Sequence, residues 1–239
     1  MQKFARFIVS ILLLPFLWAE CLTIFDIMPG AFSSEFPFLS RELVATVAGI
    51  ALWLVIALFI PVSNWFYVFG HELTHAAWGL ATFSKVSKIS VTSRGGFCCI
   101  ENPGMFTTLA PYFIPFYLVV LLALRAIVGI WVDMAPYAML WFAALGFAYG
   151  FHVTNTITSI VTVDQPDIRV YGRFFSCVFI LSANLLFLGI GFAMLAGTPA
   201  AEFASIAADR IVGTYSAVAA GLARFAVWLA GRARGLARG

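Results

Sequence analysis

The sequence contains few charged residues. Asp, Glu, Lys and Arg make up 10% of its 239 residues, whereas 62% are hydrophobic and the mean hydropathy is +0.98. Soluble globular domains contain about 25% charged residues, so this composition excludes an ordinary soluble domain and indicates an integral membrane protein. The basic residues are dispersed or gathered near the C-terminal end, without a soluble fold to present them. We therefore expect no nucleic-acid partner.

Cysteine and histidine are also scarce. The four cysteines are too scattered for a disulfide framework and include no Cys-x-x-Cys pair of the kind that binds metal. We interpret the adjacent Cys98 and Cys99 as strand residues rather than a redox pair. Of the three histidines, two lie four residues apart, at His71 and His75.

Long apolar runs divide the chain. A chain of 239 residues has room for about six spans of roughly 20 residues. We expect these spans near residues 5–25, 43–62, 64–82, 106–131, 137–162 and 174–197. The sequence thus predicts an all-α polytopic membrane protein with an external loop over 26–42. The first run follows Lys3 and Arg6 and is interpreted as a transmembrane helix, because no small-residue cleavage site follows it.

The orientation in the membrane has two solutions. Lys3 and Arg6 place the N-terminus inside by the positive-inside rule, and six spans place the Arg-rich tail inside too. A basic insert over 84–100 then lies outside. If the segment 64–82 is instead short or re-entrant, the insert returns to the cytoplasmic side and a seventh span is needed. We expect the tail over 198–239 to be an interfacial helix, with a weak seventh span as the alternative.

The stretch His71-Glu72-Leu73-Thr74-His75 matches the zinc-metallopeptidase pattern His-Glu-x-x-His. Helix positions four apart share a face, so the imidazoles of His71 and His75 can bind one tetrahedral Zn²⁺. Glu72 lies about 100° around the helix. From there it can act as general base toward a water whose pKa zinc lowers toward about 7. Ionisable groups in an apolar segment are costly and by default functional.

A polar insert over residues 84–100 follows the motif. Val86, Ile89 and Val91 lie among polar residues in a roughly alternating pattern, and Gly95-Gly96 can supply a turn, so we expect a β-hairpin. A solvated connector is the alternative. We expect the free edge of the hairpin, at Ile89 and Val91, to bind an extended peptide by strand addition.

A catalytic zinc needs a third protein ligand and one open position. We rank Asp167 first, followed by Asp164 and His152. Pro166 separates the two aspartates and interrupts the helix, which can turn a carboxylate toward a neighbouring helix. Two further carboxylates lie in apparent turns, where solvated side chains are ordinary, and are discounted: Glu101 and Asp133.

His152 lies within the run 137–162, one turn before Asn155 and Thr156. Such a polar row faces the interior of a bundle rather than lipid. We interpret His152 as a catalytic group and Asn155 as a substrate-binding group, each able to donate a hydrogen bond to the oxyanion that forms when water attacks a carbonyl. A role of His152 as third ligand, or in a plain interhelical hydrogen bond, stays open.

Over roughly residues 64–175 the chain resembles the site-2 protease family of intramembrane zinc metalloproteases. The likeness rests on His71-Glu72-Leu73-Thr74-His75, the insert around Gly95-Gly96 and a downstream acidic motif. The resemblance implies a core of three helices, zinc held by two histidines and a later aspartate, and cleavage of a transmembrane or juxtamembrane peptide. The third motif differs, because Asp164-Gln165-Pro166-Asp167-Ile168 stands in place of the family's Asn-x-x-Pro-x-x-x-x-Asp-Gly pattern.

The sequence therefore predicts a multi-pass membrane zinc metallopeptidase, expected in a bacterial inner (plasma) membrane, that cleaves a membrane-protein or peptide substrate. The alternatives are a non-proteolytic protein with a structural or sensory zinc site, and a proton or metal transporter. Glu72 favours the enzyme, because a structural zinc needs no general base, and we find no internal inverted repeat of the transporter kind. We divide the chain into N-terminal helices with the external loop (1–63), the metalloprotease core (64–175) and the last span with the Arg-rich tail (176–239).

Overall fold

The computed structural model describes residues 2–31, 40–60, 64–162 and 165–236. Within these ranges the chain is mostly helical and contains one small sheet, as predicted. Four of the described helices are long and apolar enough to cross a membrane: α1 (Gln2–Ile27), α2 (Arg41–Phe59), α8 (Arg173–Ala196) and α9 (Ala200–Leu236). A bent pair of shorter helices raises this number to five if the pair forms one span. The length and hydropathy of these helices indicate a membrane protein.

The apolar run predicted as one helix over 106–131 is broken. It forms α4 (Met105–Phe113) and α5 (Phe116–Val128), which are bent by 79° relative to each other. Ile114 between them has an extended backbone, with φ −91° and ψ 110°. The reason is Pro115, since proline disfavours the α conformation in the preceding residue and has no N–H to donate.

The run predicted over 137–162 forms a short 3-10 turn, η2 (Ala135–Tyr137), and α6 (Ala138–Val161). With 24 residues, α6 is long enough to cross a membrane. Its second half contains His152, Asn155 and several threonines, which lower its hydropathy, and α6 is not among the four candidate spans.

Glycines bring α6 close to α2. A Cβ atom added to Gly49 of α2 or to Gly146 of α6 would collide with the backbone of the opposite helix. Small residues allow this approach, as they do between membrane helices in general. The close pairing fixes α6, which carries His152, relative to α2.

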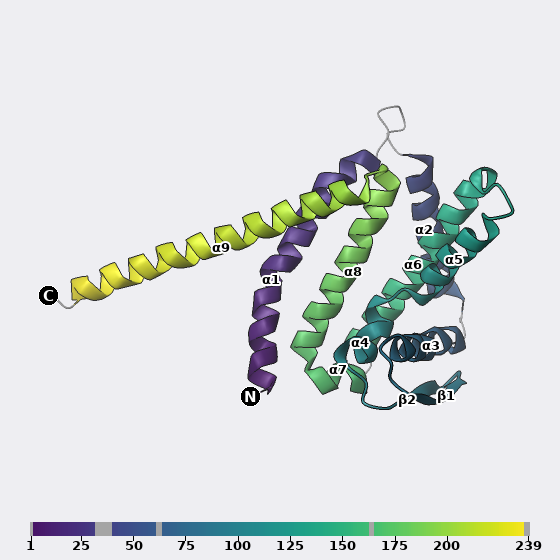
Figure 1. The fold of residues 1–239 in the computed structure, drawn as a ribbon, viewed down its shortest axis with the longest axis horizontal. Helices are drawn as coiled ribbons and strands as arrows, with labels where there is room; N and C mark the ends of the chain where they lie inside the picture. Colours follow the sequence, from purple (N-terminus) through teal and green to yellow (C-terminus); the bar gives the residue numbers. More distant parts are fainter. Residues whose placement is uncertain (1, 32–39, 61–63, 163–164, 237–239) are drawn as a thin grey trace.

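α3 (Trp65–Ala81) contains the His-Glu-x-x-His motif and lies across the end of the bundle rather than along it. It has 17 residues and shares this end with the N-terminus, the hairpin and α7 (Pro166–Tyr171) (Figure 1). This placement favours the alternative in which the segment 64–82 is short or re-entrant over the one in which it spans the membrane. The chain therefore remains, after α3, at the end of the bundle at which α1 begins.

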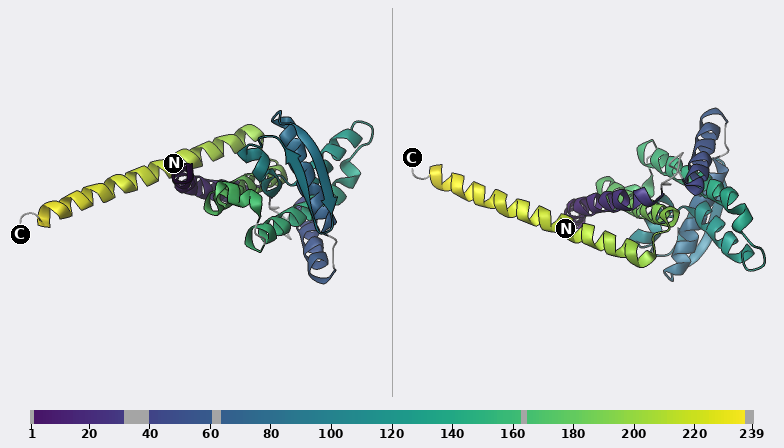
Figure 2. Two further views of the ribbon diagram at one scale, coloured as in Figure 1. Left: turned by 90° about the horizontal axis from the view of Figure 1, so that it is seen from below. Right: turned by 90° about the horizontal axis from the view of Figure 1, so that it is seen from above.

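The predicted hairpin is confirmed. β1 (Val86–Thr92) pairs antiparallel with β2 (Gly95–Ile100), and both strands pack on α3, as the view from below shows (Figure 2). The position of the turn differs from the prediction. Because Thr92 pairs with Gly95, the turn consists of Ser93 and Arg94, and Gly95-Gly96 begin β2.

The predicted tail helix is α9, which starts at the opposite end of the bundle from the N-terminus and extends away from it (Figures 1 and 2). Near its start α9 packs on α1, where the guanidinium of Arg210 pairs with Asp26. Tyr215 Oη also donates to the Leu12 carbonyl at 2.6 Å. The predicted external loop falls mostly on residues 32–39, which lie outside the described residues.

A buried cluster lies where α4, α7 and α8 meet, next to the motif helix. Its members are Leu109, Ala110, Tyr112, Phe113, Ile168 and Ile180. The cluster joins α8 to elements of the predicted core, and the predicted boundary at residue 175 falls inside α8. It fixes the positions of α4 and α7 relative to each other.

Candidate metal centre

The two histidines of the motif lie on one face of α3, as their spacing predicts. The centroids of the His71 and His75 rings are 4.8 Å apart. His75 is buried and His71 is half-buried, so both rings lie inside the protein rather than in solvent.

The start of α7 brings the third predicted ligand to this face. Pro166 begins the helix, where its fixed φ suits a helical start and its missing N–H is not needed. Asp167 follows, and its Oδ2 lies 3.6 Å from Nε2 of His71 and 3.3 Å from Nε2 of His75. One ligand atom from each of the three residues lies within 4.8 Å of the others. The structure thus brings together the three residues predicted as metal ligands.

The other predicted candidates lie elsewhere. Asp164 lies outside the described residues. Glu101 Oε1 pairs with Lys85 Nζ at 3.1 Å, where both side chains are exposed. Asp133 Oδ1 accepts a hydrogen bond from the Ala135 N–H at 2.9 Å. These local partners agree with the exclusion of Glu101 and Asp133 from the predicted ligands.

Each histidine is also held at its second ring nitrogen. Nδ1 of His75 lies 2.9 Å from the Thr107 carbonyl oxygen of α4. Nδ1 of His71 lies 3.3 Å from Tyr67 Oη, which in turn lies 2.6 Å from Ser159 Oγ of α6. Histidines that bind metals commonly have such partners, which fix the orientation of the ring. Here they leave both Nε2 atoms toward Asp167.

Sequence reasoning missed the partners that surround the three residues. Tyr112 Oη donates to Asp167 Oδ2 at 3.2 Å, and its ring lies edge-on to His71 at a centroid distance of 5.2 Å. Tyr67 had a detectable signal, because it stands four residues before His71 on the same helix face. Thr107 and Tyr112 had none, since both approach from α4 only in the folded protein.

A cavity of about 400 Å³ opens beside the three residues. Glu72 lines it together with His71 and His75, and the other walls come from β2, the segment after β2 and α7. Gly96 is required for this arrangement, because a Cβ atom at this position would lie 2.8 Å from Glu72 Cγ and 2.7 Å from Val68 Cγ1. The glycine lets β2 approach the motif helix directly at Glu72.

The carboxylates of the site differ in acidity. Burial raises the pKa of Glu72 to about 6, near the range in which a general base works best at neutral pH. Burial also opposes ionisation of Asp167, but the imidazoles of His71 and His75 outweigh it and hold the pKa of this carboxyl below its usual range. Asp167 is therefore the anionic member of the set and Glu72 the more basic carboxylate.

The hairpin residues expected to bind a peptide do not line this cavity. Ile89 and Val91 lie on β1, whereas the strand at the cavity is β2, which contributes Phe97 and Cys98. The edge next to the cavity is therefore that of β2. The sequence could not distinguish the strands, because both flank the same turn.

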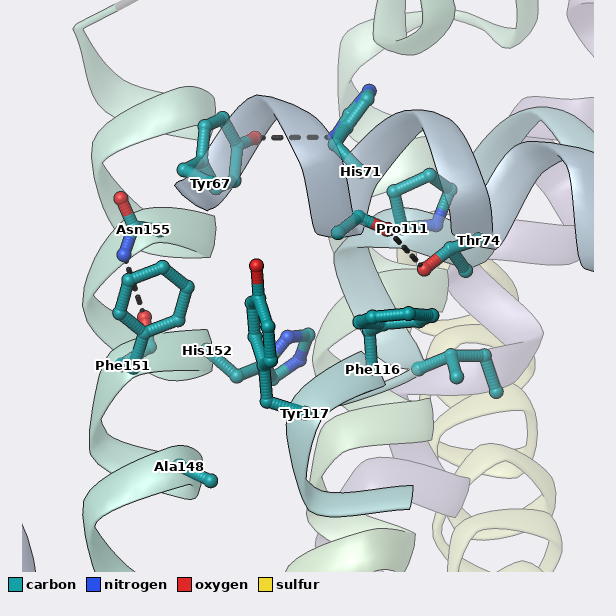
Figure 3. Close-up of a pocket in the computed structure, with 12 residues that line it drawn as sticks. Tyr67, His71, Thr74, Pro111, Phe116, Tyr117, Ala148, Phe151, His152 and Asn155 are labelled. Carbon is teal, nitrogen blue, oxygen red and sulfur yellow. Dashed lines mark hydrogen bonds between the residues drawn. The ribbon is translucent and has the colours of Figure 1, made fainter. Parts of the chain in front are cut away.

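His152 and Asn155 line a second pocket, of about 20 Å³, that shares His71 with the cavity. Figure 3 shows the imidazole of His71 turned away from His152. His152 Nε2 lies 3.1 Å from Asn184 Oδ1 of α8, and Asn155 Nδ2 donates to the Phe151 carbonyl at 2.8 Å. The described contacts of His152 are those of an interhelical hydrogen bond, and His152 is not part of the three-residue cluster.

The donor set fits a zinc ion. Two imidazole nitrogens and one carboxylate oxygen are a known ligand combination of catalytic zinc, in which the fourth position stays open for water or substrate. The ring partners of both histidines meet the further requirement that the ligands be oriented from outside. No protein-family model, curated protein or solved structure matches the chain.

Proposed function

We propose that the protein is a zinc-dependent intramembrane endopeptidase that hydrolyses peptide bonds in or near transmembrane segments. The proposal is carried by one observation. His71, His75 and Asp167 converge on one point, and Glu72 lines the cavity beside them. The resemblance of the motif region to site-2 proteases leads to the same proposal.

Two features favour a catalytic over a structural zinc. Structural sites hold the ion with four protein ligands, whereas among the described residues the cluster has three. The cluster also borders a cavity large enough for part of a peptide. A structural site needs neither an open position nor an adjacent carboxylate such as Glu72.

In the proposed reaction the residues have separate tasks. His71, His75 and Asp167 would hold the Zn²⁺ ion, which would supply Lewis acidity for the activation of water at neutral pH and for polarisation of a peptide carbonyl. Glu72 accepts the proton of the attacking water and transfers it to the leaving amine. The ring partners of His71 and His75 keep the ligands in place while charge develops at the scissile carbonyl.

The substrate is proposed to bind as an extended strand. A transmembrane helix satisfies its own backbone, so its scissile bond is accessible only after unwinding, and the unwound segment needs new hydrogen-bond partners. β2 borders the cavity and offers such partners along its outer edge. A membrane-protein or peptide substrate that pairs with β2 as an additional strand would lie beside Glu72.

We propose about six crossings: α1, α2, the α4–α5 pair, α6, α8 and α9. With the first five crossings the N-terminus and the end of α8 would lie at opposite faces, and Figure 1 shows them at opposite ends of the bundle. A crossing of α9 returns the arginine-rich tail toward the face of the N-terminus, as the positive-inside rule favours. The metal centre then lies at the cytoplasmic end of the bundle, in a bacterial inner membrane.

The test is the Glu72→Gln variant in detergent or nanodiscs. Because Glu72 is not a ligand, we expect the variant to retain zinc as measured by elemental analysis. Cleavage of a transmembrane model peptide with Gly or Pro at its centre should fall by about two to four orders of magnitude, the usual contribution of a general base. Wild-type cleavage rates in Glu72→Gln would exclude the proposed reaction, and a wild-type protein without bound zinc would exclude the metal site.

A further inference from the structure

Tyr112 is the most deeply enclosed side chain at the metal centre. It is 0% exposed, and its hydroxyl donates to the same Asp167 oxygen that faces both histidines. Its ring lies against His71. The side chain therefore contacts two of the three candidate ligands at once.

The backbone of Tyr112 lies at the break between α4 and α5. In an unbroken helix its carbonyl would accept the N–H of Phe116, but Phe116 is the first residue of α5, beyond the 79° bend. Two side chains from other helices donate to this carbonyl instead, Asn184 Nδ2 at 2.9 Å and Thr156 Oγ1 at 3.4 Å. A broken helix within a membrane protein needs such donors, because an unpaired carbonyl away from water is costly.

The Asn184 amide can donate to the Tyr112 carbonyl in only one of its two orientations, and the hydrogen bond with His152 selects that orientation. The amide oxygen of Asn184 lies 3.1 Å from His152 Nε2, so the imidazole donates through Nε2 and the amide nitrogen is left for the Tyr112 carbonyl. A continuous path of contacts thus runs from His152 of α6 through Asn184 of α8 and Tyr112 of α4 to Asp167 of α7.

We propose that Tyr112 is a positioning residue of the metal centre, and that Asn184, oriented by His152, acts through it. The Tyr112 hydroxyl fixes Oδ2 of Asp167 toward the two histidines, and Asn184 holds the broken backbone from which Tyr112 projects. This inference rests on the proposed zinc site. It gives His152 a role in the alignment of Asp167 without contact with substrate.

The experiment compares Tyr112→Phe with Tyr117→Phe in the purified full chain. Both changes remove one phenol hydroxyl, but Tyr117 donates to the Phe66 carbonyl at 2.6 Å and not to a ligand. Zinc affinity is measured by competition with a chelator, and the ligand geometry by the visible absorption of Co²⁺ bound in place of zinc. Loss of an outer-shell partner typically weakens metal binding about 10–100-fold. We expect this loss and an altered Co²⁺ spectrum in Tyr112→Phe only.

A second variant, Asn184→Leu, tests the path if Tyr112→Phe fails to fold. It leaves the Tyr112 hydroxyl in place and removes its backbone anchor, so we expect an altered Co²⁺ spectrum with helix content unchanged by circular dichroism. If Tyr112→Phe has the zinc affinity and the Co²⁺ spectrum of the wild type, the inference is overturned and the proposed function stands. The same result in Asn184→Leu has this meaning where Tyr112→Phe does not fold. Failure of the wild-type protein to bind either metal would remove the proposed function and the inference together.

Discussion

At the scale of single residues, the metal centre depends on what surrounds each ligand. His75 has a backbone carbonyl at Nδ1 and His71 has a tyrosine hydroxyl, so the two rings are held by partners from different parts of the chain. Asp167 is held by Tyr112. The candidate ligands are thus each held by a protein partner as well as by one another, and we expect substitution of one of them to remove metal without unfolding the bundle.

The first prediction concerns metal content. His71→Ala and His75→Ala should lose zinc that the wild type holds at about one ion per chain, because three protein ligands are the minimum seen in catalytic sites. Asp167→Asn should weaken binding more than His152→Asn or Asp164→Asn. Asp133→Asn is the matched control for Asp167→Asn, since the hydrogen bond that Asp133 accepts lies within its own turn. Loss of zinc in His152→Asn alone among the third-ligand candidates would contradict the assignment of Asp167.

At the scale of elements, the contact between β2 and α3 decides the shape of the site. Gly96 lies against Val68 and Glu72, with the Ser90 carbonyl oxygen 2.6 Å from the position of an added Cβ atom. A side chain at position 96 would therefore displace Glu72 and Val68 on α3 or the Ser90 carbonyl of the paired strand. The hairpin is therefore a wall of the cavity as well as a connector.

The second prediction follows from this contact. Gly96→Ala should lower stability by about 1–3 kcal/mol, as overpacking does, and should reduce peptide cleavage by displacing Glu72. Gly191→Ala on α8 is the control, because nothing lies within 4 Å of the position of its added Cβ atom. Thermal unfolding and cleavage are measured for both variants. Equal behaviour of the two would show that β2 does not press on α3 at Glu72.

The third prediction tests which edge of the hairpin binds substrate. Ile89 of β1 and Cys98 of β2 are directly paired, so proline at either position removes one backbone N–H at the same level of the hairpin. The two variants differ in the edge of the hairpin that they alter, and Cys98 also lines the cavity. We expect Cys98→Pro to impair cleavage more than Ile89→Pro, with zinc content unchanged in both. A larger effect of Ile89→Pro would return the substrate to the edge expected from the sequence.

At the scale of the whole molecule, basic residues gather at the end that holds the metal centre. This end carries the N-terminus with Lys3 and Arg6, the hairpin, and the start of α8 with Arg173. Arg6 also donates to the Val170 carbonyl at 2.9 Å, which ties α1 to α7. The positive-inside rule therefore favours the proposed orientation, in which this end faces the cytoplasm.

The fourth prediction tests this orientation by cysteine labelling. In a protein whose four native cysteines are replaced by alanine, Lys3→Cys and Ser93→Cys should react with a membrane-impermeant maleimide from the same side. Asp133→Cys, between α5 and α6, should react from the opposite side, because that connection lies at the other end of the bundle (Figure 1). Labelling of Lys3→Cys and Ser93→Cys from opposite sides would mean that α3 crosses the membrane.

Several properties of this protein could be predicted from sequence because they depend on local or summed quantities. Composition alone indicates a membrane protein, and the four-residue spacing of His71 and His75 places both on one helix face. Alternation of residues predicts the hairpin. The proline before Asp167 predicts a break in the chain, and Pro115 has the same effect within the apolar run 106–131.

Only the tertiary structure decided the remaining features, because they depend on how elements pack. Hydropathy could not show that α3 lies across the end of the bundle. An apolar segment has the same hydropathy whether it crosses a membrane or packs across the ends of other helices. The choice of β2 over β1 as the cavity wall depends on Gly96 against α3. The approach of Tyr112 to Asp167 depends on the bend of α4 and on donors from α6 and α8, and such a convergence leaves no pattern in the local sequence.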